Sequence, residues 1–435
     1  MIALLAGASV LLILFLLPKR LSASSQVLSA GIARSDITPD PAMTNWVDQN
    51  PYDGILDSLH VRSLVLTGEH TSTVFICLDL IDITEEALVG IRRAVHSSTG
   101  VPEANVLVSA SHTHSGPRSP FSKALLSPIQ VAKRRGNILE DAVFQGWAKQ
   151  LPDVCAAVAS EATKAQTEVS LSIGRADAGQ WLFNRRPIDP DGNVVSTMRP
   201  DDPNCLPDGL RFGTVDPTLT VIGLRDSNGE TVATLFSVPC HPVSIYPFHK
   251  GISADWPGLA CAHIADELGG DALFLQGCAG DIVPGRRGEA ARAEMSRFFA
   301  ERTTAAIRAS HPLPPAPLRV ISGVVGLPLA PEARKDAGSD IQPVEIQAIT
   351  IGKFALVTLP GEPLNGLARE IQSRSPFPHT LVVGYTNGRG IGYVGLPGEK
   401  AKGGYEASHV GRGTDEAGKF LVETAVRMLK EQSET

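Results

Sequence analysis

The stretch TVFICLDLIDITEEALVGIRRAVHSSTGVPEANVLVSA, residues 73–110, decides the fold class. Residues 73–80 and 105–110 are apolar runs typical of buried strands, and between them apolar side chains recur at the spacing of an amphipathic helix. We expect this helix to run from about Thr84 to His96, with Asp82 and Glu85 at the spacing of a capping box. Strand, helix and strand in this order predict a parallel crossover unit and hence an α/β protein.

The same alternation recurs along the rest of the chain. The further elements we expect are strands at 61–66, 219–224, 231–238, 272–275, 345–351, 354–359 and 380–385, and helices at 257–268, 290–309, 364–373 and 414–431. A proline-rich connector at 312–317 could mark a domain boundary, but residues with chemical potential lie on both sides of it. We therefore predict mixed sheets flanked by helices in a single large catalytic domain, residues 28–435, with its site at the carboxyl ends of strands. Residues 118–137 and 187–213 are interpreted as long loops over that site.

Composition limits the classes of function. The chain has 435 residues, of which 43% are hydrophobic and 20% charged, so it can bury a large core. Its net charge of -7, without a basic block, gives no footprint for a nucleic acid partner. The six cysteines are scattered without a CxxC pair, which fits neither a zinc ribbon nor a small disulfide scaffold.

The first residues form a separate element. Residues 2–18 are apolar and uncharged, and Lys19 and Arg20 follow them. We interpret residues 1–27 as a signal peptide or membrane anchor. The basic pair after the apolar run would, by the positive-inside tendency, place the body in the cytoplasm. We nonetheless expect an exported or membrane-anchored protein, periplasmic or extracellular, with membrane association possible through this segment.

The densest chemical signal is SASHTHSGP, residues 109–117. His112 and His114 stand two residues apart at the end of a predicted strand, so their side chains point the same way if the backbone is extended. That arrangement suits one metal ligand beside an acid or oxyanion donor. The alternative is a polar loop with two surface histidines.

Polar residues also follow other predicted strands, namely His241, Asp281, Glu362 and Asn387. Ligands of α/β sheets bind at this edge, and two histidines with a carboxylate form a familiar catalytic zinc set. Each residue has another interpretation: His241 as a core residue, Glu362 as a helix cap and Asp281 as a cap or loop brace. Cys240 and Cys278 are either soft metal ligands or, as their apolar flanks favour, buried structural thiols. The segment Asp255-Trp256-Pro257 indicates a helix start with the proline at the first position.

Taken in order, these segments resemble the N-terminal catalytic domain of the neutral/alkaline (non-lysosomal) ceramidase family. The matching segments are AGIARSDITP (30–39), SHTHSGP (111–117), NRRP (184–187), the strand ending at His241, GDIVP (280–284), LPGE (359–362), GYV (392–394) and Tyr405-Glu406. The His-Thr-His-Ser-Gly-Pro element is the most specific of them.

The resemblance implies a site and a reaction. Its zinc ligands would be His112, His241, Glu362 and Tyr393, of which the tyrosine comes from the resemblance alone. The residues that would contact substrate or transition state are His114, Arg185 and Tyr405, and Asp281 would hold a supporting contact. The implied activity is zinc-dependent hydrolysis of the N-acyl amide bond of ceramide-like lipids.

The sequence departs from the pattern of this family in two segments, and we expect it to differ in domain content as well. Val283 stands where the family has a serine, and Arg118-Ser119 stand where it has two glycines. We also expect the family's C-terminal β-sandwich domain to be missing. Without the serine hydroxyl, a zinc-bound water is the expected nucleophile. The alternatives are a related metallo-hydrolase acting on a different amide or ester, and a non-catalytic binding protein on the same fold.

Overall fold

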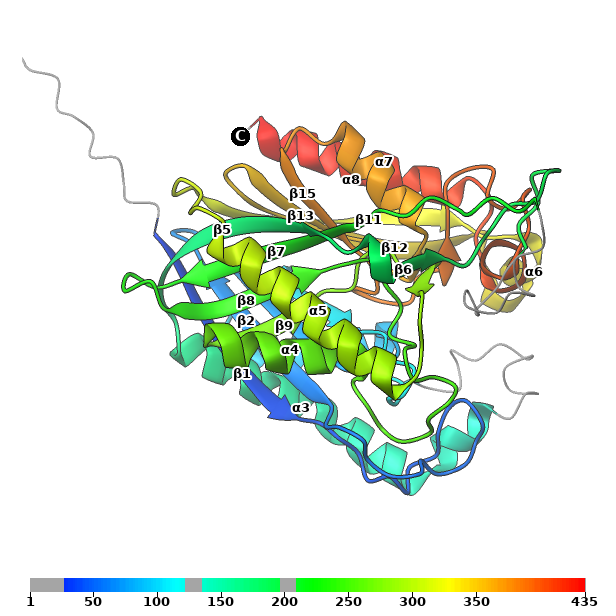
Figure 1. Ribbon diagram of the computed structural model, residues 1–435, viewed down its shortest axis with the longest axis horizontal. Helices are drawn as coiled ribbons and strands as arrows, with labels where there is room; N and C mark the ends of the chain where they lie inside the picture. Colours follow the sequence, from blue (N-terminus) through cyan, green and yellow to red (C-terminus); the bar gives the residue numbers. More distant parts are fainter. Residues whose placement is uncertain (1–26, 122–134, 196–208, 435) are drawn as a thin grey trace, which may run out of the picture.

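Two β-sheets stacked face to face form the centre of the molecule (Figure 1). The computed structural model describes residues 27–121, 135–195 and 209–434. The predicted leader, residues 1–27, lies outside the described residues except for Val27. Among the helices that the structure describes, none combines the length and the apolar character needed to cross a membrane.

The larger sheet has eight strands in the order β4-β3-β2-β1-β5-β7-β8-β9. Its strands are β1 (Leu28–Asp36), β2 (His60–Thr67), β3 (Ser72–Leu78), β4 (Val106–Ala110), β5 (Thr167–Asp177), β7 (Thr218–Arg225), β8 (Thr231–Ser237) and β9 (Asp271–Phe274). The middle of the sheet is antiparallel, whereas the outer pairs β3/β4 and β8/β9 are parallel. Within each of these outer pairs, the carboxyl ends of the two strands therefore point to the same side.

The smaller sheet has four strands in the order β11-β12-β13-β15. They are β11 (Leu318–Pro328), β12 (Ile341–Ile351), β13 (Phe354–Thr358) and β15 (His379–Val383), and the last two are parallel. Two short two-stranded pairs complete the strand set: β6 (Leu182–Asn184) with β10 (Ile282–Pro284), and β14 (Glu362–Pro363) with β16 (Tyr393–Val394).

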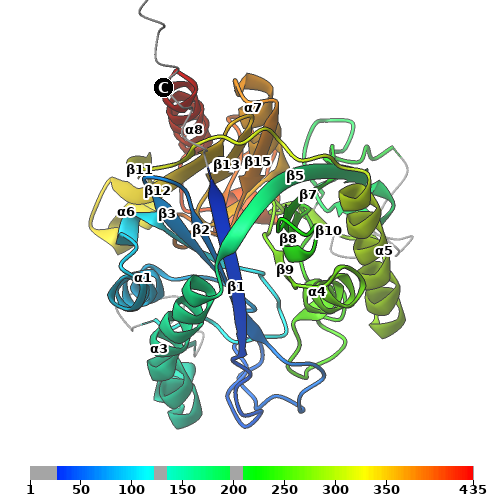
Figure 2. The ribbon, with the colours of Figure 1, turned by 90° about the vertical axis from the view of Figure 1, so that its left-hand side faces the viewer.

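Helices cover the outer faces of both sheets (Figure 2). On the larger sheet, α1 (Glu85–Thr99) and α3 (Ala142–Lys164) cover one half, and α4 (Asp255–Leu268) and α5 (Glu289–Arg308) cover the other. On the smaller sheet, α7 (Asn365–Arg374) and α8 (Ala417–Ser433) lie on the outside, and the short α6 (Pro331–Ala337) follows β11. Residues from both sides of the 312–317 connector share the core between the sheets, so the connector is no domain boundary.

The parallel crossover unit is confirmed, because β3 and β4 are parallel neighbours joined by α1. The predicted cap of that helix is wrong. The Thr84 side chain accepts the hydrogen bond from the Ala87 backbone N–H, and Asp82 is instead paired with Arg118 and Arg389. Helix α4 begins at Asp255, so Pro257 is not its first residue. Strands β1, β5 and β11 and helix α3 were not predicted from the sequence pattern.

The loops that follow several strands meet between the two sheets. The Ala110 backbone N–H donates to the Tyr385 carbonyl at 3.1 Å, and the Gly384 N–H donates to the Gln276 carbonyl at 2.9 Å. These bonds connect the ends of β4 and β9 through the extension of β15. Of the predicted loops over the site, residues 122–134 and 196–208 lie outside the described residues, and residues 135–140 form a 3-10 helix.

Helix α8 packs so closely on the segment after β16 that only glycine fits at the contact. A Cβ added at Gly418 would lie 1.9 Å from the Gly395 carbonyl oxygen. Gly418→Ala is therefore expected to lower the free energy of unfolding by about 1–3 kcal/mol in urea denaturation. Gly146→Ala in α3 is the control, because its Cβ would meet nothing within 4 Å and alanine favours helices. Equal stability of the two variants would contradict this packing constraint.

Candidate metal centre

His112 lies directly after β4 and turns inward. Its backbone has a φ of 70°, a left-handed conformation that a histidine adopts at an energetic cost. The side chain is buried, and its Nδ1 contacts the Ile81 carbonyl oxygen, which makes Nδ1 the protonated nitrogen. Nε2 is left with its lone pair, and it lies 3.3 Å from Oε2 of Glu362.

His241 reaches the same carboxylate from the other half of the large sheet. It follows β8 and is fully buried, and its Nδ1 donates to the carbonyls of Ala279 at 2.6 Å and Ile282 at 3.1 Å. Its Nε2 lies 3.5 Å from Oε2 of Glu362. Both imidazoles thus use Nδ1 for a backbone carbonyl and turn Nε2 to one oxygen, the arrangement in which metal-binding histidines are held.

Glu362 supplies the carboxylate from the smaller sheet. It does not cap α7, whose N-cap is Leu364 without a side-chain hydrogen bond. Glu362 instead begins β14 and pairs in parallel register with Tyr393 of β16. The Tyr393 phenol oxygen accepts a hydrogen bond of 3.0 Å from Nη2 of Arg185. The structure thus brings together the four residues that the resemblance implies as zinc ligands; their ligand role stays a prediction.

His114 belongs to the same cluster. Its Nε2 lies 3.3 Å from Nε2 of His112, and the candidate ligand atoms of His112, His114 and His241 all lie within 4.8 Å of one another. The rings of Trp46 and Tyr246 pack on its imidazole at centroid distances of 5.6 and 5.1 Å. Geometry alone thus places His114 within reach of a metal as well as of a substrate.

Burial favours the neutral form of two of the imidazoles. It lowers the pKa of His241 to about 3, with nearby Arg185 acting in the same direction. Burial and the neighbouring His112 and His241 likewise hold the pKa of His114 well below its ordinary value. For Glu362, burial acts to raise the pKa, but the two imidazoles outweigh it and hold the pKa well below the usual range. At neutral pH the cluster therefore presents neutral imidazoles at His114 and His241 and a carboxylate at Glu362.

The same atoms lack other partners. Nε2 of His241 and Oε2 of Glu362 are buried, and neither has a hydrogen-bond partner of good geometry among the described residues. Buried polar atoms without partners are costly, and a shared cation satisfies both. The donor set of imidazole nitrogen and carboxylate oxygen matches the preference of zinc, so these residues fit the metal.

Two further predicted residues, Arg185 and Tyr405, lie beside the cluster. Arg185 is buried, and besides Tyr393 its guanidinium contacts the Gly280 carbonyl at 2.7 Å and Glu406. Tyr405 is 50% exposed, and its ring centroid lies 5.9 Å from that of Tyr393. Their substrate contacts stay predictions.

Asp281 is a brace between loops. Its carboxylate accepts hydrogen bonds from the Asn184 side chain at 2.9 Å and the Asn365 backbone N–H at 2.7 Å, and its backbone carbonyl accepts from the Arg185 N–H at 2.8 Å. Burial raises the pKa of this carboxyl to about 6. The brace interpretation of the sequence thus matches its contacts, and they fix the backbone of Arg185.

The sequence pattern missed residues that shape the cluster. The Tyr385 ring lies 4.3 Å from that of His112, and Trp46, far away in sequence, packs on His114. A lone aromatic residue carries no positional signal, so only the folded chain reveals these contacts. Cys240 and Cys278 are buried, and among the described residues the cluster able to hold a metal contains no cysteine.

Buried neutral imidazoles and a carboxylate, gathered at strand ends beside an arginine and two tyrosines, define a candidate hydrolytic metal centre. No protein-family model matches the chain. It is 26% identical over 289 residues to neutral ceramidase B of Dictyostelium discoideum, and this alignment covers 62% of this chain and 37% of the relative. It is 23% identical over 268 residues to the neutral ceramidase of Pseudomonas aeruginosa, and this alignment covers 58% of this chain and 36% of the relative.

Solved structures show the same fold. The crystal structure of the Pseudomonas aeruginosa neutral ceramidase matches 93% of this chain and 75% of its own, with a TM-score of 0.71 and 18% identity. A ceramidase complexed with C2 matches with a TM-score of 0.71 and 17% identity, over 93% of this chain and 76% of its own. The chain is thus similar in sequence to neutral ceramidases and shares their fold. In sequence it spans a little over a third of the length of the curated relatives it matches.

The depressed pKa of His241 predicts how stability depends on pH. Between its unfolded pKa of 6.5 and its folded pKa of about 3, the unfolded chain binds a proton that the folded chain excludes. The free energy of unfolding of the metal-free protein should therefore fall as pH decreases through this range, by up to about 1.4 kcal/mol per pH unit from this group. Urea denaturation at pH 7, 6 and 5 with a chelator measures the slope. His241→Gln should show a shallower slope, and identical slopes would contradict the assignment.

Proposed function

We propose that this protein is a zinc-dependent amidohydrolase that cleaves the N-acyl amide bond of ceramide-like lipids. The observation that carries the proposal is the convergence of His112 Nε2 and His241 Nε2 on one oxygen of Glu362, at 3.3 and 3.5 Å. The sequence similarity to neutral ceramidases and the fold shared with a ceramidase complexed with C2 support the choice of substrate class.

His112, His241, Glu362 and Tyr393 would hold the zinc ion. When bound, zinc lowers the pKa of a water molecule and polarises the amide carbonyl. The chain's own contribution to this set is rigidity. Backbone carbonyls fix both imidazoles through Nδ1, and the β14/β16 pair fixes Glu362 beside Tyr393.

The remaining polar residues would act on the substrate. The imidazole of His114 and the phenol of Tyr405 can donate hydrogen bonds to the oxyanion that develops during amide hydrolysis. Arg185 can orient a polar headgroup, and Asp281 would support it by holding the Arg185 backbone. Trp46 and Tyr246 give the His114 side of the site an apolar wall.

Val283 distinguishes this chain's chemistry. It is fully buried in β10, where it pairs with Phe183, and its neighbours Ile282 and Pro284 carry no hydroxyl either. A valine side chain can neither form an acyl-enzyme nor donate a hydrogen bond. The nucleophile would therefore be water, not a residue of the 280–284 loop.

The same residue favours a second candidate function, a related metallo-hydrolase that acts on a different amide or an ester. Loss of one hydroxyl changes what the site can recognise while leaving the metal set intact. A panel of N-acyl and ester substrates separates the two functions, and a non-catalytic binding protein would cleave none of them. We also propose export or membrane anchoring through residues 1–27, which a fractionation experiment on the full chain would test.

Substitution of the proposed ligands should remove the metal. His112→Ala and His241→Ala are each expected to reduce zinc from about one ion per chain to near zero, together with activity, because each removes one of the four proposed ligands and so weakens zinc binding. Elemental analysis of the purified variants measures this. His114→Ala is the matched control, expected to lower turnover at near-normal zinc content. Loss of zinc in His114→Ala, with zinc retained in His112→Ala, would exchange the roles of the two histidines.

The nucleophile can be tested independently. Chelators should abolish hydrolysis, whereas serine-directed covalent inhibitors should leave it nearly unchanged, because the 280–284 loop offers no hydroxyl. Val283→Ser is expected to raise activity toward ceramide if the missing hydroxyl limits it. Mass spectrometry of a quenched reaction would disprove attack by water if it found an acylated peptide from this chain.

A further inference from the structure

A fully buried carboxylate next to the site has no part in the proposed reaction. Glu406 has no exposed surface, and both of its oxygens are occupied by arginines. Oε1 accepts a hydrogen bond of 2.7 Å from Nε of Arg185, and Oε2 accepts one of 3.0 Å from Nη1 of Arg186. Both guanidinium groups are buried as well, with residue exposures of 2% and 3%. A carboxylate between the two guanidinium groups attracts both and offsets their mutual repulsion in a region of low dielectric.

The contact with Glu406 determines where Arg185 points. A guanidinium is planar, so fixing Nε also fixes the direction of its Nη groups. With Nε held by Glu406, Nη2 faces the Gly280 carbonyl at 2.7 Å and the Tyr393 phenol oxygen at 3.0 Å. Tyr393 in turn lies beside Glu362 through the β14/β16 pair. Glu406 thus acts on the site through Arg185 without touching the cluster of imidazoles.

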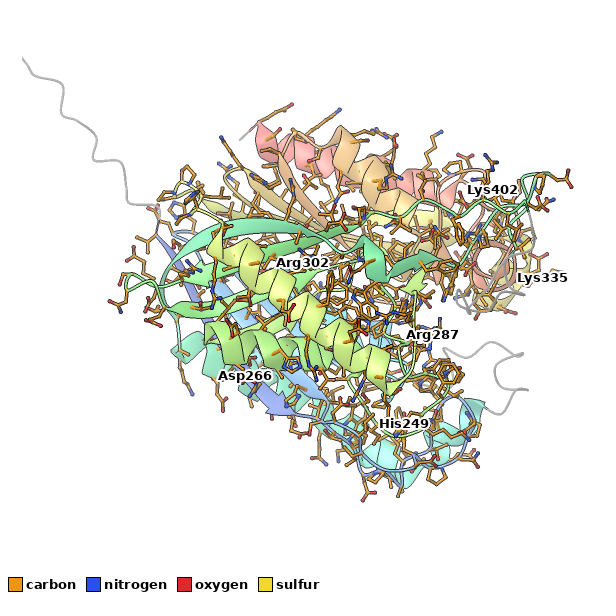
Figure 3. The ribbon with its side chains drawn as sticks, viewed as in Figure 1. His249, Asp266, Arg287, Arg302, Lys335 and Lys402 are labelled. Carbon is orange, nitrogen blue, oxygen red and sulfur yellow. The ribbon has the colours of Figure 1, made fainter. Side chains whose placement is uncertain are left out.

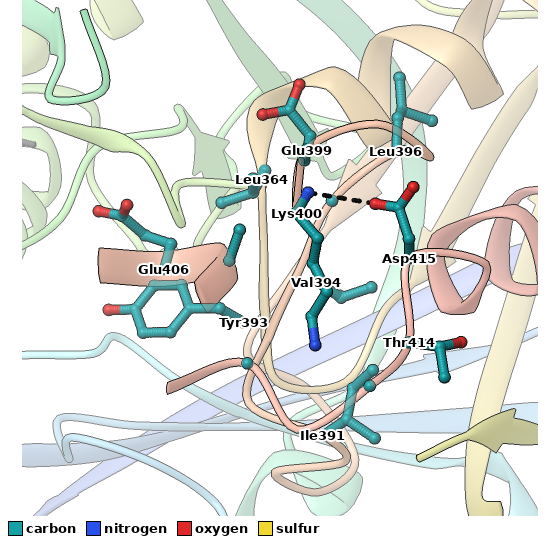
Figure 4. Close-up of a pocket in the computed structure, with 14 residues that line it drawn as sticks. Leu364, Ile391, Tyr393, Val394, Leu396, Glu399, Lys400, Glu406, Thr414 and Asp415 are labelled. Atoms are coloured by element: carbon teal, nitrogen blue, oxygen red, sulfur yellow. Dashed lines mark hydrogen bonds between the residues drawn. The ribbon is translucent and has the colours of Figure 1, made fainter. Parts of the chain in front are cut away.

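Arg186 anchors the other oxygen of Glu406 toward the surface. Its Nη2 donates to Glu399 Oε2 at 3.0 Å, and Glu399 Oε1 is paired with Lys402 at 2.7 Å. Lys402 lies at the edge of the molecule (Figure 3). Figure 4 shows Glu399, Glu406 and Tyr393 among the residues that line one small cavity. The alternating charges therefore form a continuous path from the surface to the phenol of Tyr393.

We propose that Glu406 is a positioning residue, which holds the guanidinium of Arg185 against the phenol of Tyr393. It ties residues 185–186, which follow β6, to the segment after β16, more than 200 residues later in the chain. This role goes beyond the proposed function because it holds for whatever substrate Arg185 orients.

A double-mutant cycle tests the role. Glu406→Gln keeps the volume of the side chain but removes its charge and turns an N–H group toward one guanidinium. We expect it to lower kcat/KM about 30-fold and Arg185→Ala to lower it about 100-fold, whereas the double variant should lose no more than Arg185→Ala alone. Glu423→Gln is the matched control, because Glu423 forms an exposed bidentate pair with Arg374, and it should leave kcat/KM unchanged. A multiplicative loss of about 3000-fold in the double variant would show that Glu406 acts independently of Arg185 and overturn the proposal.

A second measurement does not depend on hydrolysis. In protein labelled with 15N-arginine, the Nε–H of Arg185 is identified by its absence from Arg185→Lys. Its hydrogen exchange should be at least about tenfold faster in Glu406→Gln than in the wild type or Glu423→Gln, because the buried acceptor is lost. Unchanged exchange would overturn the proposal even in an active enzyme. If the wild type cleaves no amide or ester, the proposed function fails while the exchange data still decide the role of Glu406.

Discussion

One carboxylate oxygen between two buried imidazoles is the interaction on which the rest of the site depends. Burial alone would drive Glu362 to take up a proton, yet His112 and His241 keep its pKa low. A backbone carbonyl holds the Nδ1 of each imidazole and leaves its Nε2 facing the carboxylate. The three side chains come from segments after β4, β8 and β13, so the site exists only when both sheets are assembled.

Backbone strain at a few residues allows the side chains of the site to meet. His112, Tyr385 and Asn387 all have positive φ angles, which cost energy in residues other than glycine. Their backbones are held by hydrogen bonds across the junction of the sheets, such as the Asn387 N–H to the Val108 carbonyl at 2.9 Å. The strained residues are thus the ones that turn the chain from strand to site, while the strands themselves remain regular.

The positions where the sequence departs from the ceramidase family that it resembles lie around the cluster and leave it intact. Val283 removes a hydroxyl from the 280–284 loop, and Arg118 places a buried guanidinium on Asp82. Asp82 follows Ile81, whose carbonyl orients His112. Both changes alter the surroundings of the proposed zinc set without replacing any of its members. The substrate preference of the site can therefore differ while its metal binding is kept.

The sequence by itself determined the alternation of strands and helices and the types of residue that follow the strands. Apolar runs of strand length and a 3.6-residue period specified the β3–α1–β4 crossover, since a buried strand and an amphipathic helix each have their own periodicity. The position of His112, His241 and Glu362 just beyond predicted strands pointed to one edge of a sheet. Strands β1, β5 and β11 could not be predicted from the pattern, because they mix apolar, polar and glycine residues without a clear period of two.

Only the tertiary structure decided which of these residues meet. Spacing could not distinguish Glu362 as a cap from Glu362 as a partner of two imidazoles, because that depends on how the smaller sheet packs on the larger one. It could not place His114 within 3.3 Å of His112, since that distance arises from a left-handed turn at His112. Nor could it pair Glu406 with Arg185 and Arg186, whose contact spans more than 200 residues. The sequence determines which chemical groups the site can contain. The distances between those groups are set by the packing of segments that are remote along the chain.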